Sequence, residues 1–198
     1  MHKDMAMKVA LDSQQLAPTL SADKIYLRPA TIADYAVIKV FRQAPENCRF
    51  IRPPERDEEV LNVVKQLAEP WQFSLGRWNG LVICLQADDS LVGEIVFRID
   101  DWQHQRAEIG YRLSATATGR GICTAAAQLL IDYLFTELGF FKLVAKCDPR
   151  NIASYRVMEK LGFVREAFFK QHYLIAQQWT DQVDYGLLST DWRIKKPC

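Results

Sequence analysis

The 198-residue chain is poor in the residues that build metal sites. Its three histidines, His2, His104 and His172, lie far apart in the sequence. Its five cysteines are odd in number and show none of the spacings that hold zinc. These patterns predict no metal site, and they favour free thiols in a reducing, cytoplasmic compartment.

The chain also lacks an excess of charge and long apolar runs. Its 25 Lys and Arg residues nearly balance 24 Asp and Glu residues, for a net charge of +1. A protein that binds nucleic acid directly usually carries a broad positive surface, which this balance does not provide. No stretch approaches the roughly 20 apolar residues that cross a bilayer, and residues 1–22 lack the features of a signal peptide. We expect no nucleic-acid partner and no membrane partner.

What the chain does have is the composition of one globular domain. With 49% hydrophobic and 25% charged residues it can bury a sizeable core. We expect an N-terminal extension over residues 1–23, a domain over residues 24–192 and a short tail over residues 193–198. Residues 13–23 are rich in Gln, Ser and Pro, so this segment is expected to be loosely ordered or packed against a neighbouring subunit.

Hydrophobic periodicity predicts an α+β fold with a mixed, mainly antiparallel sheet flanked by helices. Helices are expected over residues 33–42, 58–69, 125–138 and 154–161, with Asp57 capping the second. Strands are expected over residues 25–27, 81–87, 91–99, 106–113 and 142–147, followed by a hairpin within residues 163–188. The apolar residues of that hairpin fit either the core or a contact between two copies, which leaves a homodimer open.

A glycine-containing loop, Thr118-Gly119-Arg120-Gly121-Ile122-Cys123-Thr124, separates the fourth predicted strand from a long apolar helix. Glycines let a backbone approach a ligand closely, and the free N–H groups of a first helical turn bind anions. Arg120 could add a charge-assisted contact to phosphate. The same pattern is also common in plain turns. Neither the Walker sequence nor the dinucleotide fingerprint is present, so nucleotide hydrolysis is not expected.

A second motif decides between these interpretations. The segment from Asn151 to Phe163 reads Asn-Ile-Ala-Ser-Tyr-Arg-Val-Met-Glu-Lys-Leu-Gly-Phe. With the glycine loop, it resembles the GNAT family of N-acetyltransferases over residues 24–192. Two further segments, residues 107–111 (Ala-Glu-Ile-Gly-Tyr) and 179–185 (Trp-Thr-Asp-Gln-Val-Asp-Tyr), resemble the branch that acetylates the N-termini of ribosomal proteins.

The resemblance implies that acetyl-CoA is the co-substrate, with no metal. It places the pyrophosphate on the glycine loop and the pantetheine arm, as an extra strand, between two splayed central strands. Thr118 and Cys123 depart from the family pattern, which usually has Gln or Arg and Gly or Ala there. The residues implied in cofactor binding are Tyr111, Arg112, Leu113, Thr118, Gly119, Arg120, Gly121, Ile122, Cys123, Thr124, Asn151 and Ser154.

Catalytic roles follow from the same resemblance. Met158 stands where many members carry a Tyr that protonates the leaving thiolate, so Ser154 becomes the candidate acid. Glu108 is the candidate general base, acting through water, with Glu94 in reserve and Tyr173 as a third possibility. The alternatives are structural: Glu108 is equally suited to pairing with Arg98, Arg106 or Arg112, and Asn151 and Ser154 are both good capping residues.

The acceptor is harder to read from the sequence. Arg49, Phe50 and Glu94 are the candidate substrate-binding residues, and Arg49 and Arg52 could meet carbonyls or an acidic group, or simply face solvent. Three functions stay open. The first is acetylation of a protein N-terminus, most plausibly that of a ribosomal protein. The second is acetylation of a small amine such as a polyamine, an amino sugar or an antibiotic, and the third is a non-catalytic acyl-CoA-binding module.

Overall fold

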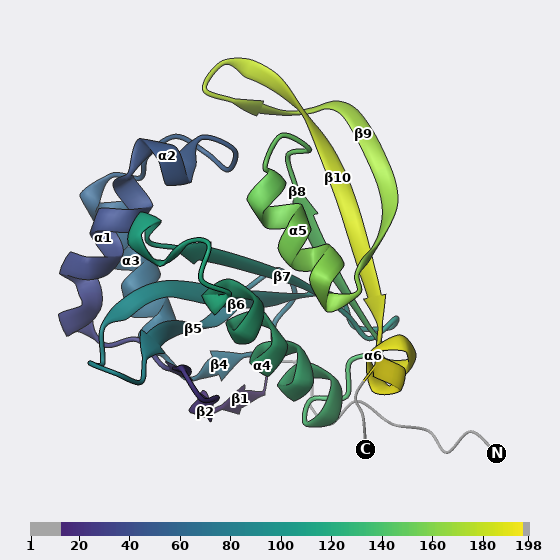
Figure 1. Ribbon diagram of the computed structural model, residues 1–198, viewed down its shortest axis with the longest axis horizontal. Helices are drawn as coiled ribbons and strands as arrows, with labels where there is room; N and C mark the ends of the chain where they lie inside the picture. Colours follow the sequence, from purple (N-terminus) through teal and green to yellow (C-terminus); the bar gives the residue numbers. More distant parts are fainter. Residues whose placement is uncertain (1–12, 196–198) are drawn as a thin grey trace.

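The computed structural model describes residues 13–195 and contains one eight-stranded sheet with the strand order β2-β3-β5-β6-β7-β8-β10-β9 (Figure 1). All neighbouring strands are antiparallel except β7 and β8, which are parallel. The predicted mixed, mainly antiparallel sheet is therefore confirmed. Its strands are β2 (Leu20–Ser21), β3 (Ile25–Arg28), β5 (Trp78–Leu85), β6 (Leu91–Asp101), β7 (Arg106–Leu113), β8 (Lys142–Cys147), β9 (Val164–Ile175) and β10 (Gln178–Leu188).

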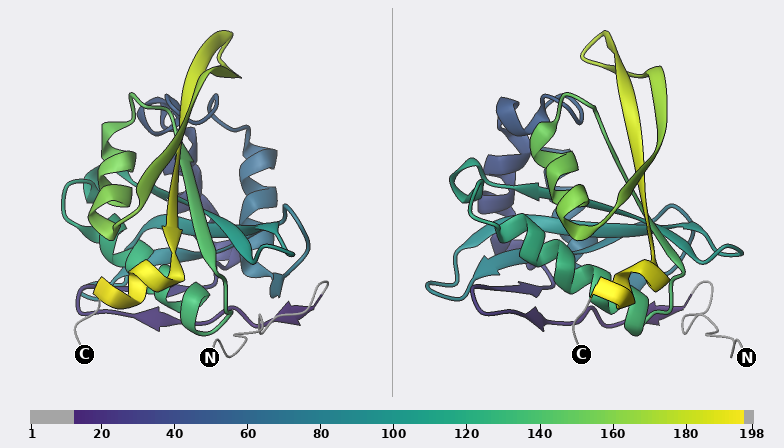
Figure 2. Two further views of the ribbon diagram at one scale, coloured as in Figure 1. Left: turned by 90° about the vertical axis from the view of Figure 1, so that its right-hand side faces the viewer. Right: turned by 45° about the vertical axis from the view of Figure 1, so that its right-hand side comes forward.

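Helices cover both faces of this sheet (Figures 1 and 2). On one face α1 packs on β6 and α3 on β5, whereas α4 lies against β3, β6 and β7, and α5 lies against β8. Two 3₁₀ turns, Ile32–Asp34 and Ala115–Ala117, precede α1 and the glycine loop. The helices are α1 (Tyr35–Gln43), α2 (Pro45–Cys48), α3 (Asp57–Ala68), α4 (Ile122–Thr136), α5 (Ile152–Leu161) and α6 (Ser189–Lys195). No helix among the described residues is long and apolar enough to span a membrane.

The two faces of the sheet bury separate clusters, and the alternation of side chains along β5 shows why. Leu81 and Ile83 point into the larger cluster, which α4 covers, whereas Val82 and Cys84 point into the smaller cluster below α1 and α3. All four side chains are fully buried. A strand buried on both faces reads as a continuous apolar run, as residues 81–85 do.

The N-terminal segment departs from the prediction. β1 (Gln14–Gln15) pairs with β4 (Trp71–Gln72), and β2 pairs with β3, so residues 13–23 belong to the folded domain of the same chain. The expectation of a loosely ordered extension is wrong for this part, because backbone pairing and the bond from Gln15 Nε2 to Tyr133 Oη (2.7 Å) fix it. Residues 1–12 and 196–198 lie outside the described residues, and α6 runs into the predicted tail.

The start of α3 also differs from the prediction. Arg56, rather than Asp57, is the N-cap residue, and the carboxylate of Glu59 accepts its backbone N–H at 2.7 Å. Asp57 is instead the first helical residue, and its carboxylate accepts hydrogen bonds from Lys39 (2.7 Å) and Gln43 (2.8 Å) of α1. Asp57 therefore ties two helices together rather than capping one.

The parallel pair at the centre of the sheet is short. β7 and β8 pair only at Arg106–Lys142, Ala107–Leu143 and Glu108–Val144, and the two strands separate beyond this point (Figure 1). From Ile109 to Leu113, β7 has a strand neighbour on its β6 side alone. This is the splay that the family resemblance implies.

The last two strands form a hairpin that projects from the body of the molecule (Figure 2). Val183, Tyr185 and Leu187 of β10 are buried in the main core, whereas other apolar side chains of the hairpin are exposed. Some apolar residues of the hairpin thus belong to the core, and others are available for a contact between two copies. The homodimer stays a prediction. The exposed set is Val164, Phe168, Phe169, Tyr173, Leu174 and Trp179.

Candidate active site

A cavity of about 490 Å³ lies beside the free edge of β7, between the glycine loop and α5. Every predicted cofactor residue except Arg120 lines it. Sequence reasoning missed Asn47, which also lines it and whose side-chain amide donates to the carbonyls of Phe41 (3.1 Å) and Leu113 (3.0 Å). Asn47 thereby fastens the end of β7 to the α1–α2 region.

The two glycines of the loop are required by backbone conformation. Gly119 and Gly121 have φ angles of +74° and +76°, in the left-handed region that disfavours residues with a side chain. A Cβ atom at either position would meet nothing within 4 Å, so the space beside the loop is open. α4 begins directly after Gly121, and the N–H groups of its first turn need acceptors from outside the helix. The loop therefore has the features of an anion site.

Cys123 fits the loop as a small apolar side chain. Burial raises the pKa of its thiol to about 12, so it stays protonated at neutral pH. The hydroxyl of Thr118 donates to the carbonyl of Ala115 at 2.8 Å and completes the preceding turn. Neither departure from the family pattern fills the open space beside the glycines.

Asn151 and Ser154 combine a capping role with a place on the cavity wall. The Asn151 side chain accepts the backbone N–H of Ser154 at 3.3 Å, which makes it the N-cap of α5. The helix therefore starts two residues earlier than predicted. The Ser154 hydroxyl donates to Tyr111 Oη at 3.4 Å, and Tyr111 Oη donates to the Ser154 carbonyl at 2.8 Å. Burial raises the pKa of Tyr111, so this hydroxyl stays protonated.

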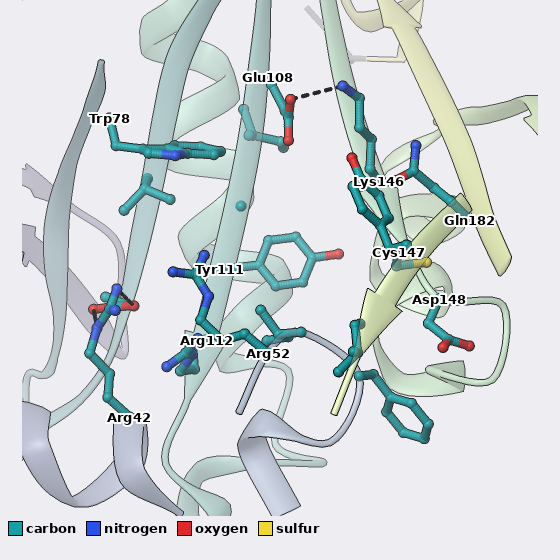
Figure 3. Close-up of a pocket in the computed structure, with 18 of the residues that line it drawn as sticks. Arg42, Arg52, Trp78, Glu108, Tyr111, Arg112, Lys146, Cys147, Asp148 and Gln182 are labelled. Carbon is teal, nitrogen blue, oxygen red and sulfur yellow. Dashed lines mark hydrogen bonds and ion pairs between the residues drawn. The ribbon is translucent and has the colours of Figure 1, made fainter. Parts of the chain in front are cut away.

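A second cavity of about 520 Å³ opens on the other side of the same strand edge (Figure 3). Its walls come from the loop of residues 50–53, from β5 to β8 and from the β9–β10 hairpin, including Tyr173. It shares Phe50, Tyr111 and Arg112 with the first cavity. The two cavities therefore meet where β7 has lost its neighbour, and a molecule held in one can reach a molecule held in the other.

Glu108 is buried in this second cavity and is paired with two cations. Its carboxylate accepts from Arg98 Nη2 at 2.8 Å and lies 3.0 Å from Lys146 Nζ (Figure 3). Arg106, a partner considered from the sequence, binds Asp100 instead. Both cations bind the same carboxylate oxygen, so the carboxylate is already held by two neighbouring side chains. Its catalytic role stays a prediction.

Glu94 belongs to a buried ionic network. Arg42 donates to both of its oxygens, at 2.6 Å from Nη2 and 3.0 Å from Nε. The remaining amino group of Arg42 binds Glu55 at 2.6 Å and 2.8 Å, and Arg52 reaches Glu55 at 3.3 Å. Because Arg42 occupies both oxygens of Glu94, the contact with substrate predicted for this residue would have to displace it.

The comparisons with known proteins match this geometry. The model of the acetyltransferase (GNAT) domain matches residues 24–164, which is well over half of the chain. The chain belongs to the GNAT family of acetyltransferases. GNAT proteins use acetyl-CoA and act on an amine acceptor, which agrees with two cavities that meet at one strand edge.

Among curated relatives, spermidine N(1)-acetyltransferase of Escherichia coli K12 is 34% identical over 163 residues, covering 82% of this chain and 85% of that protein. The ribosomal protein uS5-alanine N-acetyltransferase of the same strain is 26% identical over 93% of both chains. An uncharacterized N-acetyltransferase of Bacillus subtilis, YnaD, is 36% identical over 110 residues, and that match spans 56% of this chain and only 64% of the relative.

Solved structures show the same fold. A GNAT acetyltransferase from Bacillus anthracis superposes with a TM-score of 0.77 and 26% identity, covering 87% of this chain and 99% of that one. Mycobacterium smegmatis RimJ in complex with CoA-disulfide gives a TM-score of 0.72 at 22% identity, covering 88% and 87%.

The position of Met158 follows from the helix that carries it. Met158 is 2% exposed, packs in the main core and lines neither cavity of this GNAT protein. Ser154, one turn earlier in α5, lines the first cavity and its hydroxyl also donates to Tyr111 Oη. The structure thus keeps a hydroxyl near the strand edge, although the family's usual Tyr is absent.

Of the remaining candidate site residues, two line a cavity and one lies on the surface. Tyr173 and Phe50 line the second cavity, whereas Arg49 lines neither cavity and its guanidinium lies 5.1 Å from the centre of the Phe50 ring. Of the two expectations for Arg49, contact with the substrate or exposure to solvent, the structure shows exposure to solvent. No sequence pattern indicated a role for Lys146, because only the parallel pairing of β7 with β8 brings it to Glu108.

Replacement of Arg42 by Met should destabilise the protein strongly. Glu55 and Glu94 would then be left buried without their main partner, which costs about 3 to 5 kcal/mol in the free energy of unfolding. Urea denaturation measures this. Lys39→Met, which breaks the exposed pair with Asp57, is the matched control and should change stability little. Equal effects of the two variants would show that the buried network is not a main source of stability.

Proposed function

We propose that this GNAT protein transfers the acetyl group of acetyl-CoA to the N-terminal α-amine of a protein. The observation that carries the proposal is the meeting of two cavities at the unpaired edge of β7, where Phe50, Tyr111 and Arg112 belong to both. One cavity has the glycine loop and a helix N-terminus, and the other is open to a larger acceptor.

The residues of the first cavity fit acetyl-CoA. The loop from Thr118 to Thr124 offers backbone N–H groups and open space to a pyrophosphate, and the free edge of β7 offers backbone groups to the amides of pantetheine. Acetyl-CoA supplies the thioester when it is bound. The neighbouring fold of RimJ, solved with CoA-disulfide, supports this assignment.

The charges of the second cavity favour an α-amine over a polyamine. A polyamine pocket needs carboxylates that are free to bind several ammonium groups. Glu94 and Glu108 are instead bound by Arg and Lys side chains, and Asp148 is bound by Arg150 at 2.6 Å. A cationic chain would have to compete with these cations. Acetylation of uS5 by one relative supports a protein acceptor, whereas the spermidine acetyltransferase is the relative that favours the alternative.

Three groups of this chain match the needs of transfer to an amine. Aminolysis of a thioester requires a neutral amine, fixed donors for the oxyanion and a proton for the leaving thiolate. Ser154 holds a hydroxyl proton at the strand edge, and backbone N–H groups of β7 are available as donors. Glu108 would take the proton from the amine through water, and Tyr173, which lines the second cavity, would orient the amine.

Gly121→Glu should abolish acetyl-CoA binding, because it places a carboxylate in the space proposed for the pyrophosphate. Isothermal titration calorimetry with acetyl-CoA measures this. Gly76→Glu is the matched control, since Gly76 has nearly the same φ of +74° and equally open space but lines neither cavity. The control should lose similar stability and keep its affinity. Tight binding by Gly121→Glu would rule out the loop as the pyrophosphate site.

Ser154→Ala should slow acetyl transfer about tenfold or more while leaving the affinity for acetyl-CoA nearly unchanged, as expected for a group that acts in the transition state. Steady-state kinetics and calorimetry separate the two effects. A normal turnover rate would remove Ser154 as the acid, and a parallel loss of affinity would assign it to binding.

The acceptor can be identified with a mixed pool of peptides with different N-termini, polyamines and amino sugars, incubated with acetyl-CoA and analysed by mass spectrometry. We expect acetyl on the α-amine of peptides, with a preference for a small first residue. Acetyl on spermidine or another small amine would overturn the protein acceptor. No product would favour a non-catalytic acyl-CoA-binding module.

A further inference from the structure

The second cavity contains a guanidinium that forms no ion pair with any described residue. Arg112 is 8% exposed, and its Nη1 is buried without a hydrogen-bond partner among the described residues. Its side chain reaches into the cavity beside Tyr111 and Arg52 (Figure 3). The sequence analysis considered its side chain only as an ion-pair partner of Glu108, which binds Arg98 and Lys146 instead. A buried cation without a partner is costly, so the empty hydrogen-bonding position needs an explanation.

The carboxylates near Arg112 already form ion pairs with other arginines. Glu94 stands opposite Arg112 in the register of β6 and β7, yet both its oxygens accept from Arg42. Glu55 is bound by Arg42 and Arg52. Three arginines therefore share two glutamates, and Arg112 is the one that has no ion pair within the described part of the chain.

Among the described residues, no other carboxylate that lines the cavity forms an ion pair with Arg112. Glu108 serves both Arg98 and Lys146, and the carboxylate of Asp181 on the hairpin accepts the backbone N–H of Gln171. Counted over the lining residues and their ion-pair partners, cations exceed carboxylates by one; Asp184, which accepts from the lining residue Gln182 at 2.6 Å, lies outside this count. The cations are Arg42, Arg52, Arg98, Arg112, Lys146 and Arg150, and the carboxylates are Glu55, Glu94, Glu108, Asp148 and Asp181.

We propose that Arg112 binds a carboxylate of the acceptor. The inference rests on the proposed function and narrows it to protein N-termini with an acidic side chain among their first three residues. Arg112 follows Tyr111 at the junction of the cavities, so a group bound there lies close to the reacting amine. A carboxylate offers two acceptors to a guanidinium, and such charge-assisted pairs are strong when they are buried.

The test compares peptides that begin with Ala and differ only at the second or third residue, which is Asp, Asn or Lys. For the unmodified protein, kcat/KM should be about tenfold or more higher for Asp than for Asn, in the range that one charge-assisted hydrogen bond provides. Lys should be the poorest. Equal kcat/KM values across the panel would overturn the inference while leaving acetylation of peptides intact.

Arg112→Gln should abolish the preference for Asp while acetyl-CoA still binds by calorimetry. Arg77→Gln, which removes an exposed cation that lines neither cavity, should keep the preference. Lost acetyl-CoA affinity with an unchanged Asp preference would assign Arg112 to the cofactor and overturn the inference. If Arg112→Gln does not fold, the peptide panel on the unmodified protein still decides.

Small acceptors separate the two proposals. Acetylation of free alanine but not of alaninamide, with all peptides unmodified, would support the carboxylate subsite and overturn the peptide acceptor. Acetylation of spermidine alone would overturn both proposals.

Discussion

The short pairing of β7 with β8 is the constraint on which the rest of the structure depends. A parallel pair that ends at Glu108 leaves half of β7 with unpaired backbone groups inside a sheet that is otherwise complete. Such groups need partners, and Asn47 supplies one by binding the carbonyl of Leu113. The others are available to a ligand. Both cavities, and the residues that they share, lie along this edge.

The wall of the second cavity next to this edge is polar. Arg42, Glu94 and Arg112 are all buried there, and Arg42 of α1 binds Glu94 of β6. Ion pairs of fixed geometry keep the wall rigid, because Arg42 can bind two carboxylates in one plane. The site is therefore stabilised by electrostatic interactions that only hold while each member of the network is present.

Sequence patterns predicted the strands and loops that depend on neighbouring residues in the chain. The strand pattern of residues 106–113 and the β-branched and apolar run of residues 142–147 predicted the bounds of β7 and β8. The two motifs contain most of the residues that line the first cavity. The two-residue strands β1 and β2 have no periodicity to detect, and their pairing depends on distant partners. For the same reason the sequence could not show that Glu108 meets Lys146, or that Arg112 is left without an ion pair.

The projecting hairpin has one more consequence, which concerns aggregation. β9 is the edge strand of the sheet, and a long regular edge invites pairing with other chains. Here the register with β10 shifts twice, between Thr180 and Gln182 and between Asp184 and Tyr185, and Gln171 has a positive φ of 48°. These irregularities twist the strand and interrupt its row of hydrogen-bonding groups. The hairpin can thus carry exposed aromatic side chains beside the second cavity without offering a straight edge to which other chains can pair.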